Sequence, residues 1–474
     1  TIELKFSDKA PAVGAAPAVG RLDISQFVNQ EIVIDELGAK YDGTKWIPAP
    51  GSRTLKTTLR TSERAKLPPG TVNALIATGF LRTNGTKVDI LRKLRVVYPA
   101  DPHNPNVLSS GKTRLPVVVL VHGMHGVWDG AKQVPNHEGY TYLQEELARH
   151  GIVSVSVDTN IANVFNSRIE MRAESVLGAL DDLRTMDRDS TSRFYNRLDF
   201  SKVGMMGHSR GGEAVVRAAI LNAARPAADR YGIKAVCSLA PTDFTGTTTP
   251  VTVQKLNASH ADFYLVLYGA LDGDVAGFGG ATDAVGTGFR LYDRASVPKA
   301  MVFLDACNHN RFNDVWSTDD SGPADVARLV TREEHRKLAN EYIGGLFRMQ
   351  LLGASAPAGL LDGTTANTLG AKTSIQWSFG KTIKTFDAFD DPAAADLGAR
   401  TLFGAGVQEM AKIKTNGTFV DERTNHQTGV LDLKPNVPGP PPVAYELAIL
   451  AAHANWSGFN RLLFRVCADA DVST

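Results

Sequence analysis

The stretch G-H-S-R-G-G at residues 207–212 decides how the middle of this chain folds. It follows a short apolar run at 203–206 and precedes a run rich in alanine and valine at 213–224, which favours a helix. The pattern G-x-S-x-G between a strand and a helix predicts a sharp turn that presents the hydroxyl of Ser209 at the edge of a sheet. Side chains at positions 207 and 211 would collide with such a turn, so both positions require glycine.

The region around this turn alternates between strand-like and helical patterns. Continuous apolar runs are typical of parallel strands that are buried on both faces, and a first strand at 88–98 is expected to be antiparallel. Sheets of this kind bind ligands at the carboxyl ends of their strands. We therefore predict an α/β fold with a mostly parallel, doubly wound sheet over 86–355, with strands at 115–121, 152–157, 203–206, 234–239, 263–268 and 300–304 and helices at 139–150, 168–186 and 331–352.

Both flanks of this region have a different character, so the 474 residues are expected to form three domains. Residues 356–474 contain few helical patterns and a proline-rich stretch, which favours a C-terminal β-sandwich-like domain with strands that include 373–379 and 461–466. Residues 1–85 are predicted to form an N-terminal β-rich module, because clusters of proline and glycine separate short β-type runs at 2–6, 31–34, 54–58 and 74–81.

Composition and charge limit the function classes. The chain has 51 Lys and Arg against 50 Asp and Glu, and no long run of one sign. Nucleic acid and anionic membrane surfaces are therefore not expected as partners. No stretch is long and apolar enough to span a bilayer. The chain begins at Thr1, which a removed leader would explain; this favours a secreted or periplasmic protein, although a trimmed chain would look the same.

The three cysteines do not predict a disulfide framework. Cys237 and Cys307 lie in or just after apolar runs and are expected to be buried thiols, and Cys467 is the third cysteine. One bridge is possible but not favoured. The sequence gives no prediction of the oligomeric state.

Chemistry at Ser209 would require two further side chains. A serine hydroxyl is a weak nucleophile and needs an adjacent imidazole that is oriented by a carboxylate. In folds with this serine turn, the chain order is serine, then an acid, then histidine. Asp272 follows the strand at 263–268 and His309 follows the strand at 300–304, so both are expected beside Ser209. Asp274 is the alternative acid, and Asp305 is expected to be structural.

The strand at 115–121 runs into a second glycine-containing loop, which reads H-G-x-x-G at 122–126. Glycine in such a loop lets backbone N–H groups approach a substrate carbonyl, so we expect the N–H groups of Met124 and Arg210 to form an oxyanion hole. The alternative is a glycine-rich turn without a catalytic part. Metal binding by His122, His125 and His137 is conceivable but lacks a carboxylate or cysteine in ligand spacing.

With these motifs in place, residues 86–352 resemble the α/β-hydrolase superfamily. The six residues 207–212 are similar to the corresponding segment of chlorophyllases and of dienelactone-hydrolase-like and cutinase-like bacterial esterases. Arg210 also resembles the arginine that follows the nucleophile in glucuronoyl esterases, which do not share the rest of the segment. The resemblance implies serine-dependent hydrolysis of carboxylic esters by Ser209, His309 and Asp272, with no metal or organic cofactor.

The substrate is expected to be a small-molecule ester or a bulky, polymeric one, because the loop at 272–289 is rich in glycine and alanine and could open widely. Two alternatives remain: a peptide or amide hydrolase of the same fold, and a catalytically inactive polymer-binding protein that uses Trp46, Trp377 or Trp456 as stacking platforms. Side chains that could line the pocket are Trp128, His208, Phe278 and Trp316, with Phe289 and Phe312 nearby in the sequence.

Overall fold

The computed structural model describes residues 87–378, apart from 102, 110–113, 131, 165–168, 244–253 and 276–288. Outside this range it describes short strands at 18–28, 32–34, 40–41, 46–47, 55–57, 81–84, 407–409, 418–421, 426–429 and 445–447.

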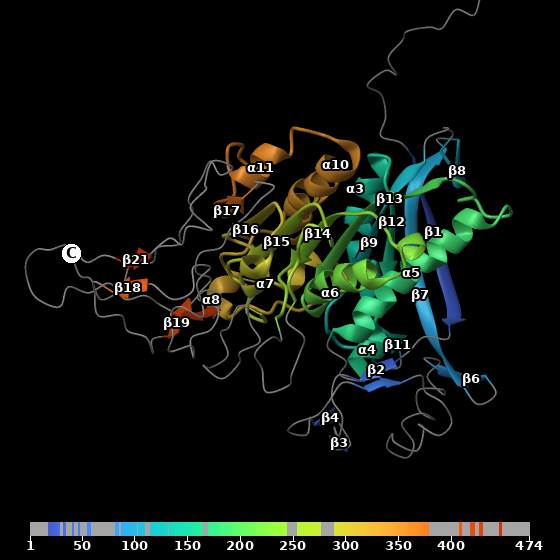
Figure 1. Cartoon of the computed structure of the whole chain (residues 1–474), viewed down its shortest axis with the longest axis horizontal. Helices are drawn as coiled ribbons and strands as arrows, with labels where there is room; N and C mark the ends of the chain where they lie inside the picture. The colour runs from blue at the N-terminus through green and yellow to red at the C-terminus, as the bar shows by residue number, and fades with distance from the viewer. Residues whose placement is uncertain are drawn as a thin grey trace, which may run out of the picture.

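An 11-stranded sheet forms the centre of the described part of the chain (Figure 1). The strands from β12 to β16 in spatial order run parallel, β1 and β7 continue the sheet antiparallel at one side, and β17 closes the other side antiparallel. The spatial order is β1 (Ala18–Val28), β7 (Lys87–Asp101), β12 (Val153–Val157), β9 (Leu115–Val121), β13 (Leu198–His208), β14 (Ile233–Leu239), β15 (Tyr264–Gly269), β16 (Lys299–Leu304) and β17 (Thr373–Ser378), with β6 (Leu81–Asn84) and β8 (Asn104–Leu108) also paired to β7.

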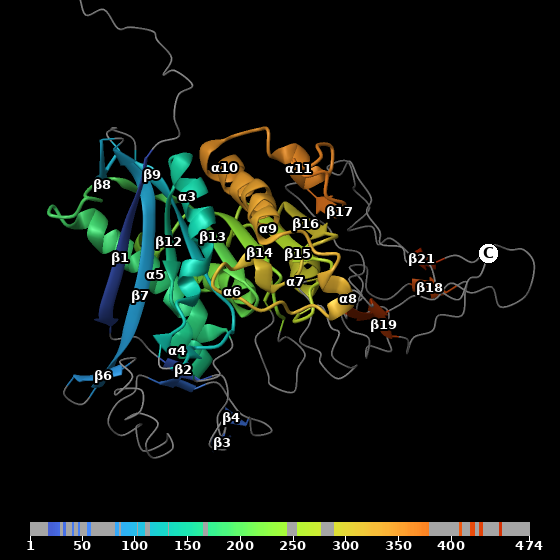
Figure 2. The same cartoon turned by 180° about the vertical axis from the view of Figure 1, so that it is seen from behind.

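Helices cover both faces of this sheet, as Figures 1 and 2 show from opposite sides. Successive side chains of a strand point to opposite faces. In β9, Val117, Val119 and Val121 accordingly belong to one buried cluster, which also contains apolar residues of α5 (Glu170–Arg188) and α6 (Arg210–Ala224). Val118 and Leu120 belong to the opposite cluster, with residues of α3 (Thr141–Arg149) and α10 (Gly345–Leu352). The mostly parallel, doubly wound sheet predicted from the sequence is confirmed.

The predicted closing helix at 331–352 is present as three successive helical segments. The side chain of Thr331 accepts the N–H of Glu334 and starts α9 (Arg332–Ala339), a π-helical turn spans Asn340–Gly344, and α10 ends at Gly353 with φ of +75°. Shorter helices connect the strands: η1 (Asn136–Tyr140), α4 (Asn160–Val164), η2 (Ala227–Asp229), α7 (Phe289–Arg294), η3 (Asn310–Phe312), α8 (Pro323–Val326) and α11 (Ala358–Asp362).

The central sheet extends into both ranges that the sequence assigns to flanking domains. β1 pairs with β7 from Ala18 to Val28, and β17 pairs with β16, so the boundaries predicted at 85 and 355 do not coincide with the edges of the sheet. Leu22 and Ile24 of β1 pack on one core cluster, and Ile375 and Trp377 of β17 pack on the other. In each of these two strands, alternate side chains are apolar and point toward the core, so pairing with the sheet buries them.

The other described strands form two-stranded pairs. They are β2 (Ile32–Ile34) with β5 (Leu55–Thr57), β3 (Lys40–Tyr41) with β4 (Trp46–Ile47), β10 (Trp128–Asp129) with β11 (Lys132–Gln133), β18 (Val407–Glu409) with β21 (Tyr445–Leu447), and β19 (Thr418–Asp421) with β20 (His426–Gly429). The predicted strands at 2–6 and 461–466 lie outside the described residues, and the division into three domains stays a prediction.

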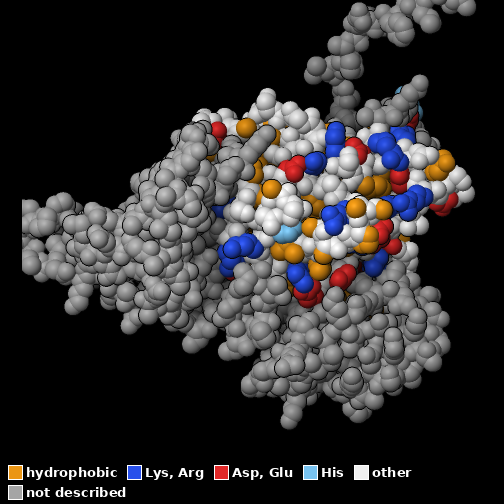
Figure 3. Space-filling model, viewed as in Figure 1, with side chains coloured by type: hydrophobic (Ala, Val, Ile, Leu, Met, Phe, Trp, Pro, Cys, Tyr) orange, Lys and Arg blue, Asp and Glu red, His pale blue; other side chains and the backbone are white. Residues whose placement is uncertain are grey.

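Basic and acidic side chains are interspersed over the coloured part of the face shown in Figure 3, in line with the net charge of +1. Within the described residues, no helix is both long and apolar enough to cross a membrane. Cys237 and Cys307 are buried and unpaired, as expected, and Cys467 lies outside the described residues.

Candidate active site

Ser209 sits in the sharp turn between β13 and α6. Its backbone has φ of +58° and ψ of −126°, a conformation that is unfavourable for a residue with a side chain and that is found mainly at functional sites. The turn is tight, because a methyl group at Gly207 would lie 1.9 Å from the carbonyl oxygen of Gly211. The N–H of Ser209 donates to the carbonyl of Leu239 at 2.9 Å, which fixes the turn to the end of β14. The predicted strand–serine–helix turn is therefore confirmed.

The loop after β9 lies directly against this serine. A methyl group at Gly123 would come within 2.4 Å of Ser209 Cβ and 3.0 Å of its Oγ, so the position requires glycine. Met124, the next residue, is 38% exposed at the surface of the same loop. The predicted neighbourhood of 122–126 and Ser209 is thus observed, and an oxyanion hole made of the N–H groups of Met124 and Arg210 stays a proposal.

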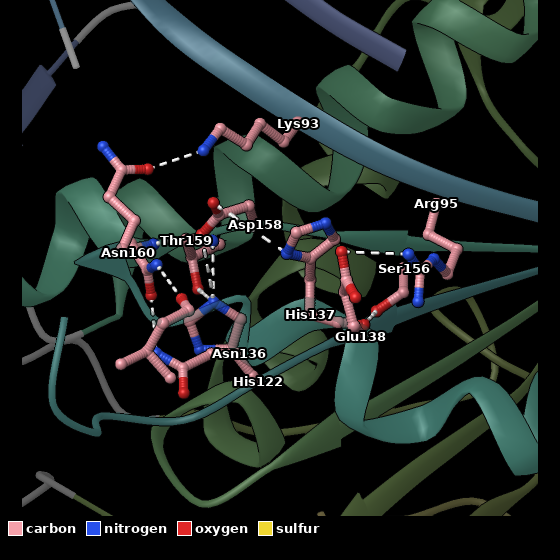
Figure 4. A network of polar contacts seen from close by, with 12 residues as sticks. Lys93, Arg95, His122, Asn136, His137, Glu138, Ser156, Asp158, Thr159 and Asn160 are labelled. Carbon is pink, nitrogen blue, oxygen red and sulfur yellow. Dashed lines mark hydrogen bonds and ion pairs between the residues drawn. The ribbon is translucent and has the colours of Figure 1, made fainter. Parts of the chain in front are cut away.

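His122 supports this loop from inside the protein (Figure 4). Its Nε2 accepts the backbone N–H of Thr159 at 2.8 Å, so that nitrogen carries no proton, and its Nδ1–H donates to the carbonyl of Gly123 at 2.8 Å. Burial lowers the pKa of His122, although the hydrogen bond and charge of Asp158 act in the opposite direction. A neutral imidazole with both nitrogens engaged is a structural group.

The metal site considered for His122, His125 and His137 is therefore not formed. His122 Nε2 already uses its lone pair, and His137 Nδ1 lies 3.9 Å from Asp158. Within the described ranges, no group of three or more ligand-type side chains could hold a metal ion.

Asp272 and His309 meet at the carboxyl ends of β15 and β16. His309 Nδ1 lies 2.7 Å from Asp272 Oδ2, and both side chains are almost completely buried. The other oxygen of Asp272 accepts the N–H groups of Asp274 and Val275, each at 2.9 Å. Three donors thus hold this carboxylate in place, and it is Asp272 rather than Asp274 that orients the ring.

Asp274 lies on the opposite side of the same ring. Its Oδ2 is 3.5 Å from His309 Nε2, and its side chain is 55% exposed. Burial alone would lower the pKa of His309, yet the charge and hydrogen bond of Asp272, helped by the charges of Asp274 and Asp320, raise the pKa to about 9. Position 309 therefore combines a buried ring with a strong affinity for a proton.

The hydroxyl of Ser209 does not bond to this histidine in the structure. No hydrogen bond from any described residue reaches His309 Nε2, although the rings of His309 and His208, the residue before the serine, are 4.5 Å apart between centroids. Serine–histidine hydrogen bonds are often long before substrate binds. The structure thus brings Asp272 to His309 and places both beside the serine turn, but it does not contain the hydrogen bond between Ser209 and His309.

Trp316 packs behind these imidazoles rather than lining an open pocket. Its ring stacks on His125 at 4.8 Å and 7°, contacts His208 at 4.8 Å, and lies parallel to His309 at 6.1 Å. Trp316 and His208 are completely buried, and Tyr140 OH pairs with His208 Nδ1 at 3.0 Å. Neither side chain reaches the surface in this structure, so their contact with substrate stays a prediction, and both rings pack beneath the site.

The other side chains that were predicted to line the pocket differ in how exposed they are. Trp128 is 41% exposed on the short strand β10, so it is available to a ligand, whereas Phe312 is completely buried. Phe278 and the side chain of Phe289 lie outside the described residues.

Sequence reasoning missed the buried polar residues that join the loops around the site. Asn136 Oδ1 accepts the indole N–H of Trp316 at 2.7 Å, and Asn136 Nδ2 donates to the carbonyl of Gly126 at 3.0 Å. Asn136 Nδ2 also donates to Asn160 Oδ1 at 2.7 Å (Figure 4). Asn163, one turn further along α4, donates to the carbonyl of His125 at 3.0 Å. Isolated asparagines outside any motif carry no signal of this role in the sequence.

A second missed residue is Asp320, in the segment after η3. Its carboxylate accepts backbone N–H groups from Gly273, His309 and Asn310. The residue lies in an ordinary run of turn-forming residues, so only the three-dimensional structure reveals its contacts.

The mostly parallel sheet and the strained serine turn define the class of fold, which is that of the α/β-hydrolases. Within that class, the model of a family described as PET hydrolase-like matches residues 133–263. This segment contains Ser209 but ends before Asp272 and His309.

Curated relatives point in the same direction. The chain is 32% identical over 115 residues to Cutinase est1 of Thermobifida alba, which covers 24% of this chain and 34% of the relative. It is 33% identical over 100 residues to Cutinase 2 of Thermobifida cellulosilytica and to Cutinase cut1 of Thermobifida fusca, covering 21% of this chain and 33% and 27% of those relatives. The chain thus spans about a third of the length of the curated relatives it matches.

Proposed function

We propose that this chain is a carboxylic ester hydrolase that uses Ser209, His309 and Asp272 as a catalytic triad. The observation that supports this most is the 2.7 Å contact between two buried side chains, His309 and Asp272, at the sheet edge where Ser209 occupies a strained turn. An imidazole held by a carboxylate beside a strained serine is the arrangement that acyl transfer to a hydroxyl requires.

The reaction then proceeds in two halves. His309 Nε2 accepts the proton of Ser209 while Oγ attacks the ester carbonyl, and Asp272 stabilises the imidazolium that forms. The backbone N–H groups of Met124 and Arg210 donate to the negative oxygen. The imidazolium returns its proton to the leaving alcohol, which gives an acyl-enzyme at Ser209. Water, deprotonated by the same imidazole, releases the acid. Each step uses groups of the chain and water.

The substrate is a bulky or polymeric ester. Two apolar side chains, Met124 and Trp128, are exposed in the segment after β9, whose Gly123 lies against Ser209, and an extended chain could lie across this surface. The relatives are named cutinases and the matching family PET hydrolase-like, which agrees with a polymeric substrate. A polymer cannot cross a membrane, so of the two locations that the sequence favours the proposal includes the first, a secreted enzyme.

The test of this function is Ser209→Ala, assayed on p-nitrophenyl butyrate and on a polyester film. We expect turnover to fall by about 10⁴-fold or more on both substrates, because the nucleophile is lost, while the melting temperature stays close to that of the wild type. Undiminished release of p-nitrophenol by the variant would remove the serine from the mechanism.

Two further measurements separate the alternatives. Faster cleavage of a p-nitroanilide than of the matched ester would favour an amide hydrolase. A wild-type protein that binds the polymer but hydrolyses no ester would favour a binding protein; of the three tryptophans considered as platforms, Trp377 packs partly buried on the core, and Trp456 and the side chain of Trp46 lie outside the described residues.

A further inference from the structure

The carboxylate of Asp320 joins the two loops that carry the acid and the base. Its Oδ2 accepts the N–H of Gly273 at 2.8 Å and the N–H of His309 at 3.1 Å, and its Oδ1 accepts the N–H of Asn310 at 2.8 Å. Gly273 directly follows Asp272 in the chain. One side chain therefore bonds to the backbone beside the acid and to the backbone of the base itself.

The surrounding contacts show that this is a close-fitted arrangement. A methyl group at Gly273 would lie 2.2 Å from the carbonyl oxygen of Asp320, so the two segments are in direct backbone contact. Ser321 Oγ donates to the carbonyl of Leu271 at 2.7 Å, on the other side of Asp272. The segment 320–321 thus holds the backbone on both sides of the acid.

The neighbouring Asp319 has a different role. It forms a two-pronged ion pair with Arg311 at 2.7 Å and 2.8 Å and accepts from Asn308 Nδ2 at 3.2 Å. These contacts fasten the outer side of the same segment, but none of them reaches the loop of Asp272 or the backbone of His309. Asp319 is therefore a matched control, adjacent in sequence and equal in charge.

The charge of Asp320 also acts on the imidazole. Burial and the nearby charge of Asp272 raise the pKa of Asp320, while the N–H groups of Asn310 and Gly273 favour its ionised form. Three carboxylates face His309, those of Asp272, Asp274 and Asp320. Its other neighbours are the imidazoles of His125 and His208 and the indole of Trp316. The charge of Asp320 helps to raise the pKa of His309.

We propose that Asp320 is a positioning residue for the acid–base pair: it fixes the distance between the loops after β15 and β16 and thereby aims the imidazole of His309 at Ser209. This inference rests on the proposed ester hydrolysis. A carboxylate with three N–H donors from two loops can hold them in one relative position, and a misplacement of reacting groups by about 1 Å lowers rates by about 10²-fold.

The experiment compares Asp320→Asn with Asp319→Asn in the full chain, with p-nitrophenyl butyrate as substrate. An asparagine at 320 keeps one acceptor oxygen but turns an NH₂ group toward backbone donors. We expect kcat to fall by about tenfold or more with KM changed by less than about threefold. The acidic limb of kcat/KM should move to lower pH, because a charge that favours the imidazolium is lost. Asp319→Asn should keep the wild-type limb and kcat within about twofold.

A conservative variant separates charge from simple folding defects. Asp320→Glu keeps the charge but displaces the oxygens, so it should lower kcat while its acidic limb stays near that of the wild type. If Asp320→Asn does not fold, Asp320→Glu is compared with Asp319→Glu, and a lower kcat at equal KM for the former supports the proposal.

Two results would overturn the positioning role. One is that Asp320→Asn and Asp319→Asn have the same kcat and the same acidic limb of the pH profile. The other is that Asp320→Glu and Asp319→Glu have equal kcat. Failure of the underlying function is distinguishable, because the wild type would then release no p-nitrophenol, or Ser209→Ala would release it as fast as the wild type.

Discussion

The serine side of the site and the histidine side are built by different means. Around Ser209, backbone packs on backbone: Gly123, Gly207 and Gly211 leave no room for a methyl group, so the geometry is set by the absence of side chains. Around His309, the backbone is held by carboxylates, with Asp272 and Asp320 each accepting several N–H groups. Steric exclusion makes the first side insensitive to pH, whereas the second side depends on charge.

The largest effect in this comparison is expected from Asp272→Asn. The amide cannot stabilise the imidazolium and favours the wrong tautomer of His309, so kcat should fall by about 10⁴-fold. Asp274→Asn is the control, because Asp274 is more than half exposed and lies at the other ring nitrogen; its kcat should stay within about tenfold of the wild type. Steady-state kinetics on p-nitrophenyl butyrate measure both, and similar losses in the two variants would contradict the assignment of Asp272.

The serine side is tested by Gly123→Ala. The added methyl group would lie 2.4 Å from Ser209 Cβ, so either the loop or the serine must shift, and kcat should drop by about 10²-fold. In Gly126→Ala the new methyl group meets no atom within 4 Å, and kcat should change by less than about twofold. Equal activity of the two alanine variants would show that the close contact with the serine has no catalytic consequence.

The histidine side predicts a pH dependence. His309 must be neutral to accept the serine proton, and its pKa is raised to about 9. Below that pH the protonated form dominates, so kcat/KM should rise about tenfold per pH unit toward about pH 9 and then level off. Asp274→Asn removes one charge that raises this pKa and should move the limb to lower pH. A profile that is flat between about pH 6 and pH 9 would contradict the account.

The smallest effect concerns the ring stack beneath both sides. Trp316→Phe removes the N–H that Asn136 Oδ1 accepts and leaves a buried acceptor without that partner. We expect the free energy of unfolding to fall by about 1–3 kcal/mol, measured by urea denaturation. The exposed Trp128 provides the matched control, and Trp128→Phe should change stability by less than about 0.5 kcal/mol. A Trp316→Phe protein as stable as the control would mean that the indole hydrogen bond contributes nothing.

The features of the fold and of the site that the sequence could predict are those set by local patterns. The turn at Ser209 and the strand Leu115–Val121 are local patterns, set by glycine spacing and by a continuous apolar run, and the structure has them where the sequence predicts them. The proximity of Asp272 and His309 follows from chain order, because each comes directly after a parallel strand.

Other features depend on contacts between distant parts of the chain. The pairing of β1 with β7 and of β17 with β16 joins segments that short strand patterns cannot assign to a partner, so the edges of the sheet were predicted as separate domains. Trp316 and His208 are buried because four rings, which come from distant segments of the chain, pack against one another. Asp320 has no local signature, since its donors come from two other strand ends.

The most direct test of the central claim is to identify the residue that reacts with a fluorophosphonate probe in the wild-type enzyme. Peptide mass spectrometry should find one adduct, on Ser209, and labelling should slow strongly in His309→Ala because the hydroxyl then lacks its base. An adduct on another residue, or an enzyme that hydrolyses p-nitrophenyl butyrate while Ser209 stays unlabelled, would contradict the account.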